Sequence, residues 1–339
     1  MKRLTLDEIG HLAGVSRATV SRVINNYPHI TPEVRERVQK VITQTGYQPN
    51  VIARSLASNR STIIGLVIPS DALTIFTDPY FPSLIQGITQ STNQLNLTLS
   101  LFLFHSMEEE IRTARSILNT GLLDGVIITA DRREDSFVSS VLKHGLPFVV
   151  IGRPELVGDI PFVNVDNVSG AQLATEHLIA HGRRRVATIR SVSNTAGEDR
   201  FIGFQNALRN HSIKLDPRLV AYGDFSLESG YVAMQQLLPA KPDAVFIASD
   251  TMALGAQRAI REAGLRIPDD VAIVGFDDLP PSVHAEPQLT TVRQPVRQMG
   301  STAVELLNNI VNGIHDSPAQ IILPVELIVR ASCGSEHTN

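Results

Sequence analysis

From Thr62 onward, apolar runs of strand length alternate with helical stretches, and this alternation restricts the possible folds more than any other feature of the sequence. Four such runs come first: TIIGLVIPS, LTLSLFLF, DGVIITA and PFVVIGR. The segments between them have the apolar spacing of amphipathic helices. A strand, a helix and a second parallel strand form a right-handed unit, so repetition of this pattern predicts a parallel, doubly wound α/β sheet.

A second series of the same kind opens at FVNVDN and continues through RVATIRS, DAVFIASD and DVAIVGFD. Each strand ends in a polar or acidic residue, at the edge where open α/β sheets bind ligands. The last part of the chain, LTTVRQPV to IILPVELIVRAS, is predicted to return strands to both sheets, and two facing sheets make a hinged cleft. The predicted body spans 61–339, with a first subdomain at about 61–161 and 292–323 and a second at about 162–291 and 324–335.

Residues 5–26, TLDEIGHLAGVSRATVSRVINN, have the pattern of two short helices joined by a tight turn. Leu6, Ile9 and Leu12 recur at helical spacing, which predicts a first helix with a single apolar face. Gly14 ends that helix and permits the turn that a helix-turn-helix requires.

Capping residues mark the start of both helices. Thr5 and Glu8 have the capping-box spacing, and Ser16 is placed to cap the second helix. Because Val20 and Val23 face inward there, the outer face is short, polar and cationic, which suits a DNA major groove. A solvated helical hairpin is the alternative on this pattern alone. The outward-facing residues are Arg17, Ala18, Ser21, Arg22 and Asn25.

A third helix begins at Thr31-Pro32-Glu33, with threonine as its cap and proline in its first turn. It completes an all-α head over residues 1–46, whose core is large enough to present a helix but too small to house a catalytic pocket. Residues 47–60 follow as a hinge, in which Asn50 can cap a helix too short to be stable alone. Leu56 on that helix can wedge into a minor-groove step. A plain linker helix fits the spacing equally well.

Charge is divided unevenly along the chain. Residues 1–60 contain nine Lys/Arg and four Asp/Glu, a balance of +5, and since the whole chain carries −4 the remainder carries −9. A basic head on an acidic body indicates a polyanionic partner for the head only.

The single cysteine, Cys333, excludes an internal disulfide and a thiol metal site. The N-terminus has no apolar signal-peptide core, and no apolar run is long enough to span a membrane, so we expect a cytoplasmic protein with no cofactor and no metal. His177 and His181 lie four residues apart, as metal-binding pairs do, but no glutamate follows His177 in the HExxH manner. A helix end is the favoured interpretation of this pair.

Taken in order, these segments resemble the LacI/GalR family of bacterial transcriptional regulators over essentially the whole chain. The resemblance is carried by TLDEIGHLAGVSRATVSRVIN, GYQPNVIARSLAS, VNVDNVSGA, HLIAHGRRRVA, DRFIGF, IASDTMALGA and VGFDDLPPSVHAEPQLTTVRQP. Gly10 departs from the family pattern, which usually has alanine there, at a cost of about 1 kcal/mol of helix propensity.

The resemblance implies a two-fold dimer on a near-palindromic operator. Arg17 and Ala18 would select bases, since arginine suits guanine O6/N7 and alanine can meet a thymine methyl. Phosphates and part of the groove would be held by Thr5, Ser16, Thr19, Ser21, Arg22 and Asn25. The minor groove would be entered by Asn50, Ala53 and Leu56.

The resemblance also implies a small-molecule effector in the interdomain cleft. Phe225 would offer an aromatic face to a sugar, while Arg200 and Asp277 would bind its hydroxyls. Core packing of Phe81 and helix capping by Asp250 are the structural alternatives for those two residues. The matching positions are Tyr80, Phe81, Arg153, Arg200, Phe225, Ser249, Asp250 and Asp277, and Asp71 joins them because it follows the first strand of the body.

Other classes of protein fit the sequence less well than this family does. The sequence has no GxSxG and no Walker A motif, so an enzyme is not expected, although Asp250 with Asp277 resembles the carboxylate pair of a glycosidase. A transport-type binding protein shares the body but not the basic head. Within the family, the effector can be a sugar or a purine, of which sugar is preferred, and its action as inducer or corepressor stays open. The chain lacks a heptad tail, which favours a dimer over a tetramer.

Overall fold

The computed structural model describes residues 4–24, 27–47, 60–70, 72–130, 136–156, 158–192, 194–314 and 319–334. The chain divides into two compact units, Met1–Ser61 and Thr62–Asn339, here called the head and the body. Five residues predicted to bind DNA or effector lie outside the described residues: Asn25, Asn50, Ala53, Leu56 and Asp71.

The head consists of α1 (Leu6–Ala13), α2 (Arg17–Ile24) and α3 (Pro32–Thr45). The predicted capping box is present, because the Thr5 hydroxyl accepts from the Glu8 amide at 3.3 Å while the Glu8 carboxylate accepts from the Thr5 amide at 2.6 Å. Gly14 adopts φ 64°, the left-handed conformation that ends α1. Thr31 occupies the N-cap position of α3, but its side chain makes no capping bond.

Five buried side chains form the core of the head: Ile9, Ala13, Val20, Val23 and Val38. The prediction that Leu12 faces this core is wrong, because its side chain is 57% exposed. Ile9 and Ala13 are four residues apart and share one face of α1, whereas position 12 turns away from that face at 3.6 residues per turn.

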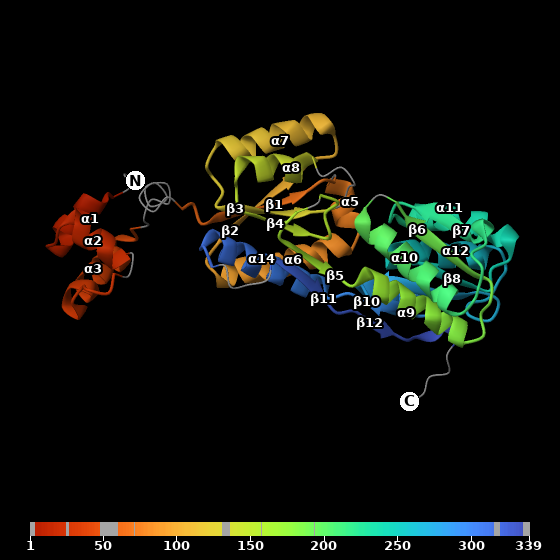
Figure 1. The fold of residues 1–339 in the computed structure, drawn as a ribbon. Coiled ribbons are helices and arrows are strands. Elements are labelled where there is room, and N and C mark those ends of the chain that lie inside the picture. Colours follow the sequence, from red (N-terminus) through yellow and green to blue (C-terminus); the bar gives the residue numbers. More distant parts are fainter. Residues whose placement is uncertain are drawn as a thin grey trace. The chain divides into compact units, whose positions relative to one another are not determined.

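In the body, each subdomain is built on one six-stranded sheet, confirming the predicted α/β architecture (Figure 1). The first sheet has the strand order β11-β5-β4-β3-β1-β2, and all its described pairings are parallel. Its strands are β1 (Ile63–Ile68), β2 (Thr98–Leu103), β3 (Gly125–Thr129), β4 (Phe148–Ile151), β5 (Phe162–Val165) and β11 (Gln320–Leu323).

Helices cover both faces of this first sheet (Figure 1). Tyr80–Gln94 (α6) and Val296–Val311 (α14) pack on one face, and Met107–Asn119 (α7) and Ser136–His144 (α8) on the other. A short helix, α5 (Ala72–Thr77), precedes α6. The strands β1 and β3 are buried almost throughout, as expected for a parallel sheet covered on both sides.

The second sheet has the order β12-β10-β9-β8-β6-β7, in which only β12 runs antiparallel to its neighbour. Its strands are β6 (Val186–Ser191), β7 (Val220–Gly223), β8 (Ala244–Ile247), β9 (Ala272–Asp277), β10 (Thr290–Arg293) and β12 (Glu326–Ile328). Its helices are α9 (Asn167–Ala180) and α10 (Thr195–Asn210) on one face, α11 (Leu227–Leu237) and α12 (Asp250–Glu262) on the other, and α13 (Pro280–His284) after β9. Short 3-10 turns occur at Pro217–Leu219, Leu238–Ala240 and Ala331–Cys333.

The chain passes between the two sheets three times, after β5, after β10 and between β11 and β12. Two predicted boundaries are therefore displaced. The segment FVNV was assigned to the second subdomain, but β5 pairs in parallel with β4 and β11 in the first sheet. Thr290–Arg293 pairs with β9, so the second crossing follows Arg293. Among the described residues, no helix is both long and apolar enough to cross a bilayer.

Glycine permits α11 and α12 to cross closely. A Cβ on Gly255 would lie 2.0 Å from the Leu227 carbonyl oxygen, and one on Gly230 would lie 2.1 Å from that of Met252. We expect Gly255→Ala to lower the melting temperature of the body, because overpacking typically costs about 1–3 kcal/mol. Gly230→Ala should have the same effect.

Differential scanning calorimetry of the full chain would measure the melting temperatures of these two variants. Helix propensity alone has the opposite sign, since alanine exceeds glycine by about 1 kcal/mol in a helix. A Gly255→Ala variant that melts at or above the wild-type temperature would show that the close crossing does not limit stability.

Candidate functional site

A cavity of about 400 Å³ lies in the body where the strands of both sheets end. Parallel strands end at the same edge of a sheet, and side chains at or just after the ends of β1 to β10 line this cavity. The first subdomain contributes Ser70, Asp78, Tyr80, Phe81, His105, Thr129 and Asn164. The second contributes Asn167, Asn194, Arg200, Asp224, Phe225, Ser249 and Asp277, with Gln294 at the second crossing.

The guanidinium of Arg200 is held from several directions. Its Nε donates to Asn167 Oδ1 at 2.8 Å and its Nη1 to the Ala248 carbonyl oxygen at 2.5 Å. Its Cζ lies 3.7 Å from the centroid of the Phe276 ring. Because these partners come from α9, β9 and the end of β8, the guanidinium is a preorganised donor in the cavity wall.

Asp277 faces Arg200 at 3.6 Å and accepts a hydrogen bond from Gln294 Nε2 at 2.5 Å. Burial raises the pKa of Asp277 to about 7, although the charge of Arg200 opposes this, and the nearby Asp78 carboxylate adds to the rise. Burial also lowers the pKa of Arg200, against the attraction of Asp277. Both pKa values shift in the direction that favours the neutral form of the group. The cost of removing these charges from water outweighs their mutual attraction.

Backbone strain is concentrated at this site. Asp277 has φ 129°, Asp278 φ 56° and Phe225 φ 72°, values that residues with side chains rarely adopt. Each such conformation costs about 1–3 kcal/mol and persists only where the surroundings hold it. Two of these strained residues, Asp277 and Phe225, line the cavity.

Six of the nine predicted effector residues line this one cavity: Tyr80, Phe81, Arg200, Phe225, Ser249 and Asp277. Phe81 is also a core residue of the first subdomain and meets Tyr80 edge to face, with 5.5 Å between ring centroids. Phe81 therefore both packs in the core of the first subdomain and forms part of the cavity wall. Arg153 and Asp250 are not among the lining residues.

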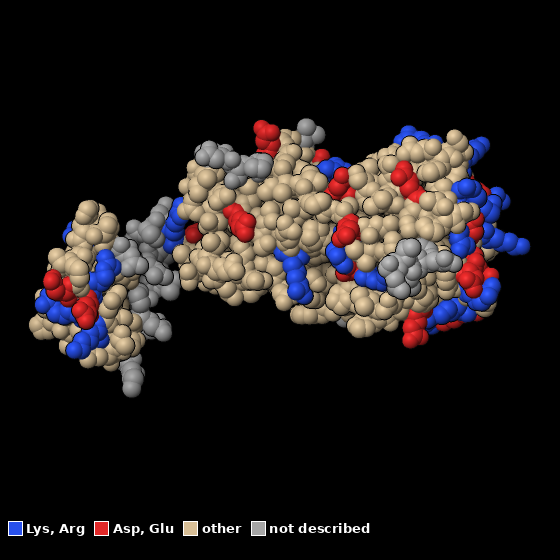
Figure 2. Space-filling model, turned by 90° about the horizontal axis from the view of Figure 1, so that it is seen from below, with Lys and Arg blue, Asp and Glu red and all other residues tan. Residues whose placement is uncertain are grey.

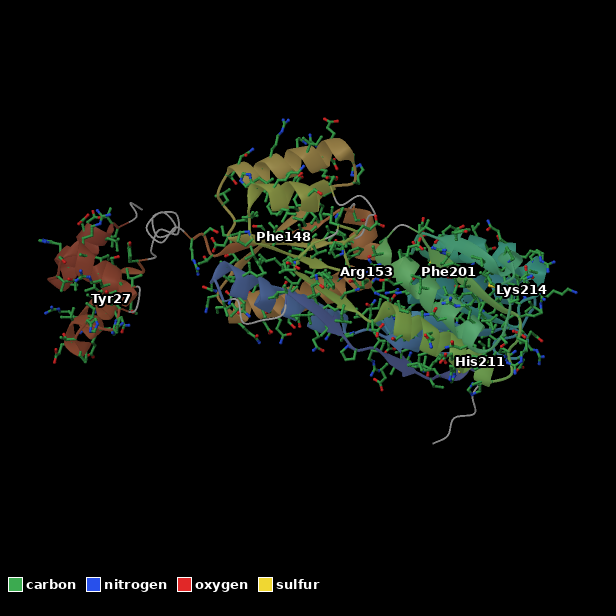
Figure 3. The ribbon with its side chains drawn as sticks, in the orientation of Figure 1. Tyr27, Phe148, Arg153, Phe201, His211 and Lys214 are labelled. Atoms are coloured by element: carbon green, nitrogen blue, oxygen red, sulfur yellow. The ribbon has the colours of Figure 1, made fainter. Side chains whose placement is uncertain are left out.

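Arg153 lies where the two subdomains meet (Figure 3). It follows β4 and pairs with Asp199 on α10 through Nη2–Oδ1 at 2.6 Å and Nε–Oδ2 at 3.1 Å. This bidentate pair occupies the guanidinium, and Arg153 is not among the side chains that line the cavity, so its predicted contact with the effector stays a prediction. The residue links the subdomains.

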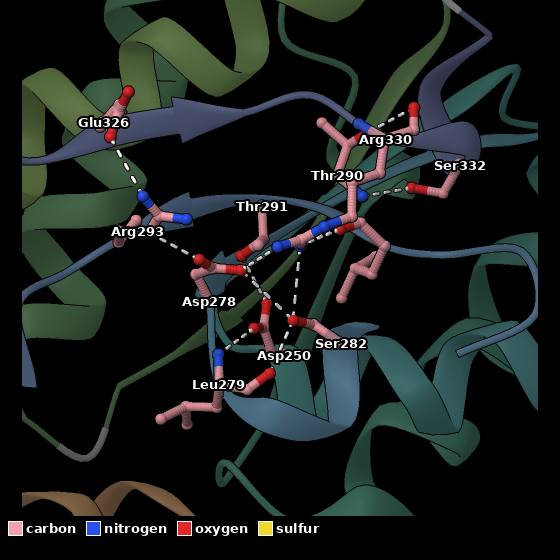
Figure 4. Close-up of polar contacts among 11 residues, drawn as sticks. Asp250, Asp278, Leu279, Ser282, Thr290, Thr291, Arg293, Glu326, Arg330 and Ser332 are labelled. Atoms are coloured by element: carbon pink, nitrogen blue, oxygen red, sulfur yellow. Dashed lines mark hydrogen bonds and ion pairs between the residues drawn. The ribbon is translucent and has the colours of Figure 1, made fainter. Parts of the chain in front are cut away.

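Asp250 lies close to Thr291 and Leu279 and is not among the lining residues of the cavity (Figure 4). Its carboxylate accepts from the Thr291 hydroxyl at 2.5 Å and from the Leu279 amide at 3.1 Å. Burial and the neighbouring Asp277 raise the pKa of Asp250 well above its ordinary value. The cap of α12 is Ser249, whose hydroxyl accepts from the Met252 amide at 3.2 Å, so the capping role suggested for Asp250 belongs to its neighbour.

Asp278, the residue after Asp277, contacts Arg293 and Arg330 (Figure 4). It accepts from Arg293 Nε at 2.7 Å and from Arg330 Nη2. Burial raises the pKa of Asp278, but these two arginines outweigh burial and hold it below its ordinary value. Glu326 also pairs with Arg293 at 3.4 Å, so the strained Asp277–Asp278 turn is tied to β10 and to the segment after β12.

Several polar lining residues were not predicted from the sequence. The amides Asn164, Asn167, Asn194 and Gln294 lie at or just after strand ends, and that position in the pattern was the available signal. The Thr129 hydroxyl at the end of β3 is buried, and among the described residues it has no hydrogen-bonding partner. A ligand hydroxyl or a water is the natural partner for such a group.

The two histidines lie at the C-terminal end of α9. His177 and His181 have ring centroids 4.3 Å apart, and His177 Nε2 lies 3.3 Å from the buried Cys333 Sγ. Among the described residues, no group of three His, Cys, Asp or Glu side chains is arranged to hold a metal ion.

On the head, the outer face of α2 carries the predicted DNA-binding residues. Arg17, Ala18 and Arg22 are exposed, whereas Thr19 and Ser21 are half-buried. Ser16 Oγ accepts from the Thr19 amide at 3.1 Å, as predicted for a cap, and lies 2.9 Å from the Thr19 hydroxyl. Arg22 lies over the Tyr27 ring at 6.0 Å, and Arg17 faces Asp7 on α1.

The raised pKa of Asp277 predicts a pH-dependent stability. The unfolded chain loses this proton near pH 3.8 and the folded chain near pH 7, so rising pH favours the unfolded state throughout that window and has no further effect above it. We expect Asp277→Asn to lack this pH-dependent loss of stability. The free energy of unfolding of the variant, measured relative to that of wild type, should therefore increase between about pH 4 and about pH 7. Urea unfolding of the full chain at a series of pH values measures the difference.

Asp224, in the same cavity, is the control. Burial raises its pKa, but hydrogen bonds from Ser226 and Ser229 outweigh burial and hold it below its ordinary value. It therefore stabilises the fold at neutral pH and loses that contribution on acidification, so Asp224→Asn should alter the pH profile with the opposite sign. Equal profiles for wild type and Asp277→Asn would refute the assignment of the titration to Asp277.

Sequence comparisons match both parts of the chain to known families. Residues 5–50 match the family described as bacterial regulatory proteins, lacI family, and residues 175–333 match the periplasmic binding protein-like domain. The HTH-type transcriptional regulator CelR of Thermobifida fusca is 37% identical over 336 residues, covering 98% of each chain. The HTH-type transcriptional repressor CytR of Escherichia coli is 34% identical and covers 97% of this chain and 96% of its own.

Solved structures agree over the same length. A complex of the transcriptional regulator CelR with cellobiose is similar with a TM-score of 0.78 at 36% identity, covering 97% of this chain and all of that one. A lac repressor dimer bound to operator and the anti-inducer ONPF has a TM-score of 0.84 at 29% identity, covering 98% and 99%.

Proposed function

Because this chain belongs to the lacI family of bacterial regulatory proteins and is a DNA-binding transcriptional regulator, we propose that it is a repressor controlled by a sugar. The head would bind a near-palindromic operator as part of a homodimer, and the sugar would bind in the cavity of the body. Arg17 and Ala18 would read bases, while the remaining polar residues of α2 would hold phosphates.

The observation that carries the sugar proposal is the lining of the cavity. A sugar needs an apolar face for its C–H surface and convergent groups that both donate and accept for its hydroxyls. Phe225, Tyr80 and Phe81 supply aromatic surface, and Arg200 with Asp277 supplies a fixed donor beside an acceptor.

The charge of the lining favours a neutral sugar over a phosphorylated one. Asp78, Asp224 and Asp277 place three carboxyl groups around the cavity, where the basic side chains are Arg200 and His105. The pKa of Asp224 is held below its ordinary value, so its carboxylate is charged at neutral pH and would repel a phosphate at short range. The volume, about 400 Å³, lies within the range of small-molecule sites, and the likeness to a cellobiose-bound regulator favours a disaccharide.

The proposed mechanism couples closure of the cavity to operator affinity. Ligand groups that touch both subdomains favour one closure state, and that state would order or separate the hinge segments of the two protomers. The direction of the effect distinguishes an inducer from a corepressor.

A thermal-shift screen of the full chain tests the effector. Cellobiose, other disaccharides, monosaccharides, sugar phosphates, nucleosides and nucleobases would be compared, and a ligand at 100 times its Kd should stabilise by about 2.7 kcal/mol. Phe225→Ala should lose most of the shift, whereas Phe76→Ala, an exposed ring outside this cavity, should keep it. A shift produced only by nucleobases or nucleosides would replace the sugar by a purine-type effector.

Gel-shift measurements test the DNA-binding part. Duplexes enriched by the full chain from a random pool should not be shifted by a chain lacking residues 1–60. Adding the stabilising ligand then gives its sign: release identifies an inducer, and tighter binding a corepressor. Undiminished binding by the truncated chain would exclude the head as the DNA reader.

A further inference from the structure

An ion pair joins the first two helices of the head at its DNA-reading end. Arg17 is the first residue of α2, and its Nη1 lies 3.6 Å from Oδ2 of Asp7 in the first turn of α1. Both side chains are largely exposed, 67% for Arg17 and 68% for Asp7. The residue proposed to read a base is therefore accompanied by a carboxylate from another helix.

The ion pair between Arg17 and Asp7 contributes little to the stability of the head. Exposed ion pairs contribute about 0–1 kcal/mol, and a carboxylate beside DNA weakens the electrostatic attraction that dominates binding. Acidic and basic side chains also lie close together on the face of the head seen in Figure 2. Glu8, the next residue, has a role in the capping box, but Asp7 has no part in that box.

We propose that Asp7 is a positioning residue that commits Arg17 to a guanine, a role that rests on the proposed DNA-binding function. A guanidinium carries five N–H donors, and the ion pair with Asp7 is made on the Nη1 side, at 3.6 Å. The Nε and Nη2 donors take no part in this ion pair, and together they have the fork geometry that matches guanine O6 and N7.

The carboxylate also acts against the competing contact. A long arginine at this position can turn to a phosphate, which holds the protein on DNA without reading sequence. Asp7 restricts the rotation of Arg17 and repels phosphate oxygens near it. It thereby lowers affinity for arbitrary DNA while preserving the base contact, which raises the specificity ratio.

The test is binding-site selection with the full chain from a random duplex pool, followed by affinity measurements over a range of salt concentrations. Wild type should enrich a near-palindrome with one guanine per half-site that Arg17→Ala no longer prefers. Asp7→Asn should keep the rest of the site but lower discrimination at that base pair about tenfold, within the 1–3 kcal/mol worth of one bidentate contact. Its binding to unrelated DNA should rise, and its salt dependence should steepen by about one phosphate contact.

Glu33→Gln is the matched control. Glu33 is exposed and occupies the same position in the first turn of α3, so its substitution removes the same charge and the same helix-dipole interaction without touching Arg17. It should leave base preference unchanged. Asp7→Glu, which keeps the charge, should retain most of the preference, and in the Asp7→Asn/Arg17→Ala double variant the base preference should match that of Arg17→Ala alone.

Three outcomes would overturn the proposal. If Asp7→Asn changes only the melting temperature, Asp7 merely stabilises α1. If Asp7→Asn changes the affinities for the selected site and for unrelated DNA by the same factor, the effect is one of net charge. The same conclusion follows if Glu33→Gln lowers base discrimination as Asp7→Asn does. If wild type enriches no sequence, the proposed DNA-binding function itself fails, which is distinct from an enriched site that Asp7→Asn leaves intact.

Discussion

Replacing Arg200 with methionine should abolish effector binding and sharply destabilise the body. The substitution removes the hydrogen bonds to Asn167 and Ala248 and leaves Asp277 buried without its partner. Breaking a buried pair in this way costs about 3–5 kcal/mol, which lowers the melting temperature by on the order of 10 °C. On the proposed function Arg200 also binds the sugar, and the loss of two charge-assisted hydrogen bonds to it would weaken binding by on the order of 100-fold or more.

A double variant separates the two effects. Arg200→Met/Asp277→Asn removes both members of the pair, so no uncompensated charge stays buried, and much of the lost stability should return. Binding should not return, because the donor is still absent. Calorimetric titration with the sugar that stabilises wild type measures affinity, and thermal unfolding measures stability. A double variant that regains both would mean that Arg200 supports the fold without contacting the ligand.

Replacing Ile9 with alanine should unfold the head and abolish operator binding while leaving sugar binding intact. Ile9 is fully buried in a core of five side chains. Its truncation costs about 2–5 kcal/mol, as much as the roughly 3–5 kcal/mol that so small a core supplies. The body is a separate compact unit, so its ligand-induced thermal shift should be unchanged.

Leu12→Ala is the control for this prediction. Leu12 lies on the same helix but is largely exposed, so its truncation should change stability by less than about 0.5 kcal/mol. Circular dichroism of the head and gel shifts of the full chain measure the outcome. If Leu12→Ala proves as damaging as Ile9→Ala, the packing of α1 seen here is incorrect.

Local patterns predicted the head well because local interactions define it. Thr5, Glu8 and Gly14 mark the ends of α1 by hydrogen bonding and by left-handed backbone, both readable within a few residues. The face of a short helix was harder to predict, as Leu12 shows. Three apolar residues at helical spacing do not tell which two of them point at the neighbouring helix.

The body shows what local patterns leave undetermined. The segment FVNV reads as a strand in either subdomain, and in the first sheet it pairs with β4 on one side and, on the other, with β11, which follows some 150 residues later in the chain. Likewise the Arg153 side chain is chemically suited to bind a ligand, but its guanidinium is paired with Asp199 on α10. In both cases one partner, β11 or Asp199, lies far along the chain, and the residues nearby do not identify it.

The lining amides illustrate the same limit in the opposite direction. Asn164 and Asn194 have no chemical signature that distinguishes them from other polar residues after strands. The convergence of strand ends on one cavity gives them their importance. The resemblance to a family predicts Arg200, Phe225 and Asp277 as effector-binding residues, and all three line one cavity.

The three crossings between the sheets have a consequence for synthesis of the protein. The head is complete once α3 has left the ribosome, but the first sheet lacks its edge strand until β11 appears and the second lacks its edge strand until β12 appears. Until then, β5 and β10 present unpaired backbone, which invites association with other chains. A message truncated after α3 but before the last strands would therefore yield a folded head attached to an aggregation-prone, unresponsive body.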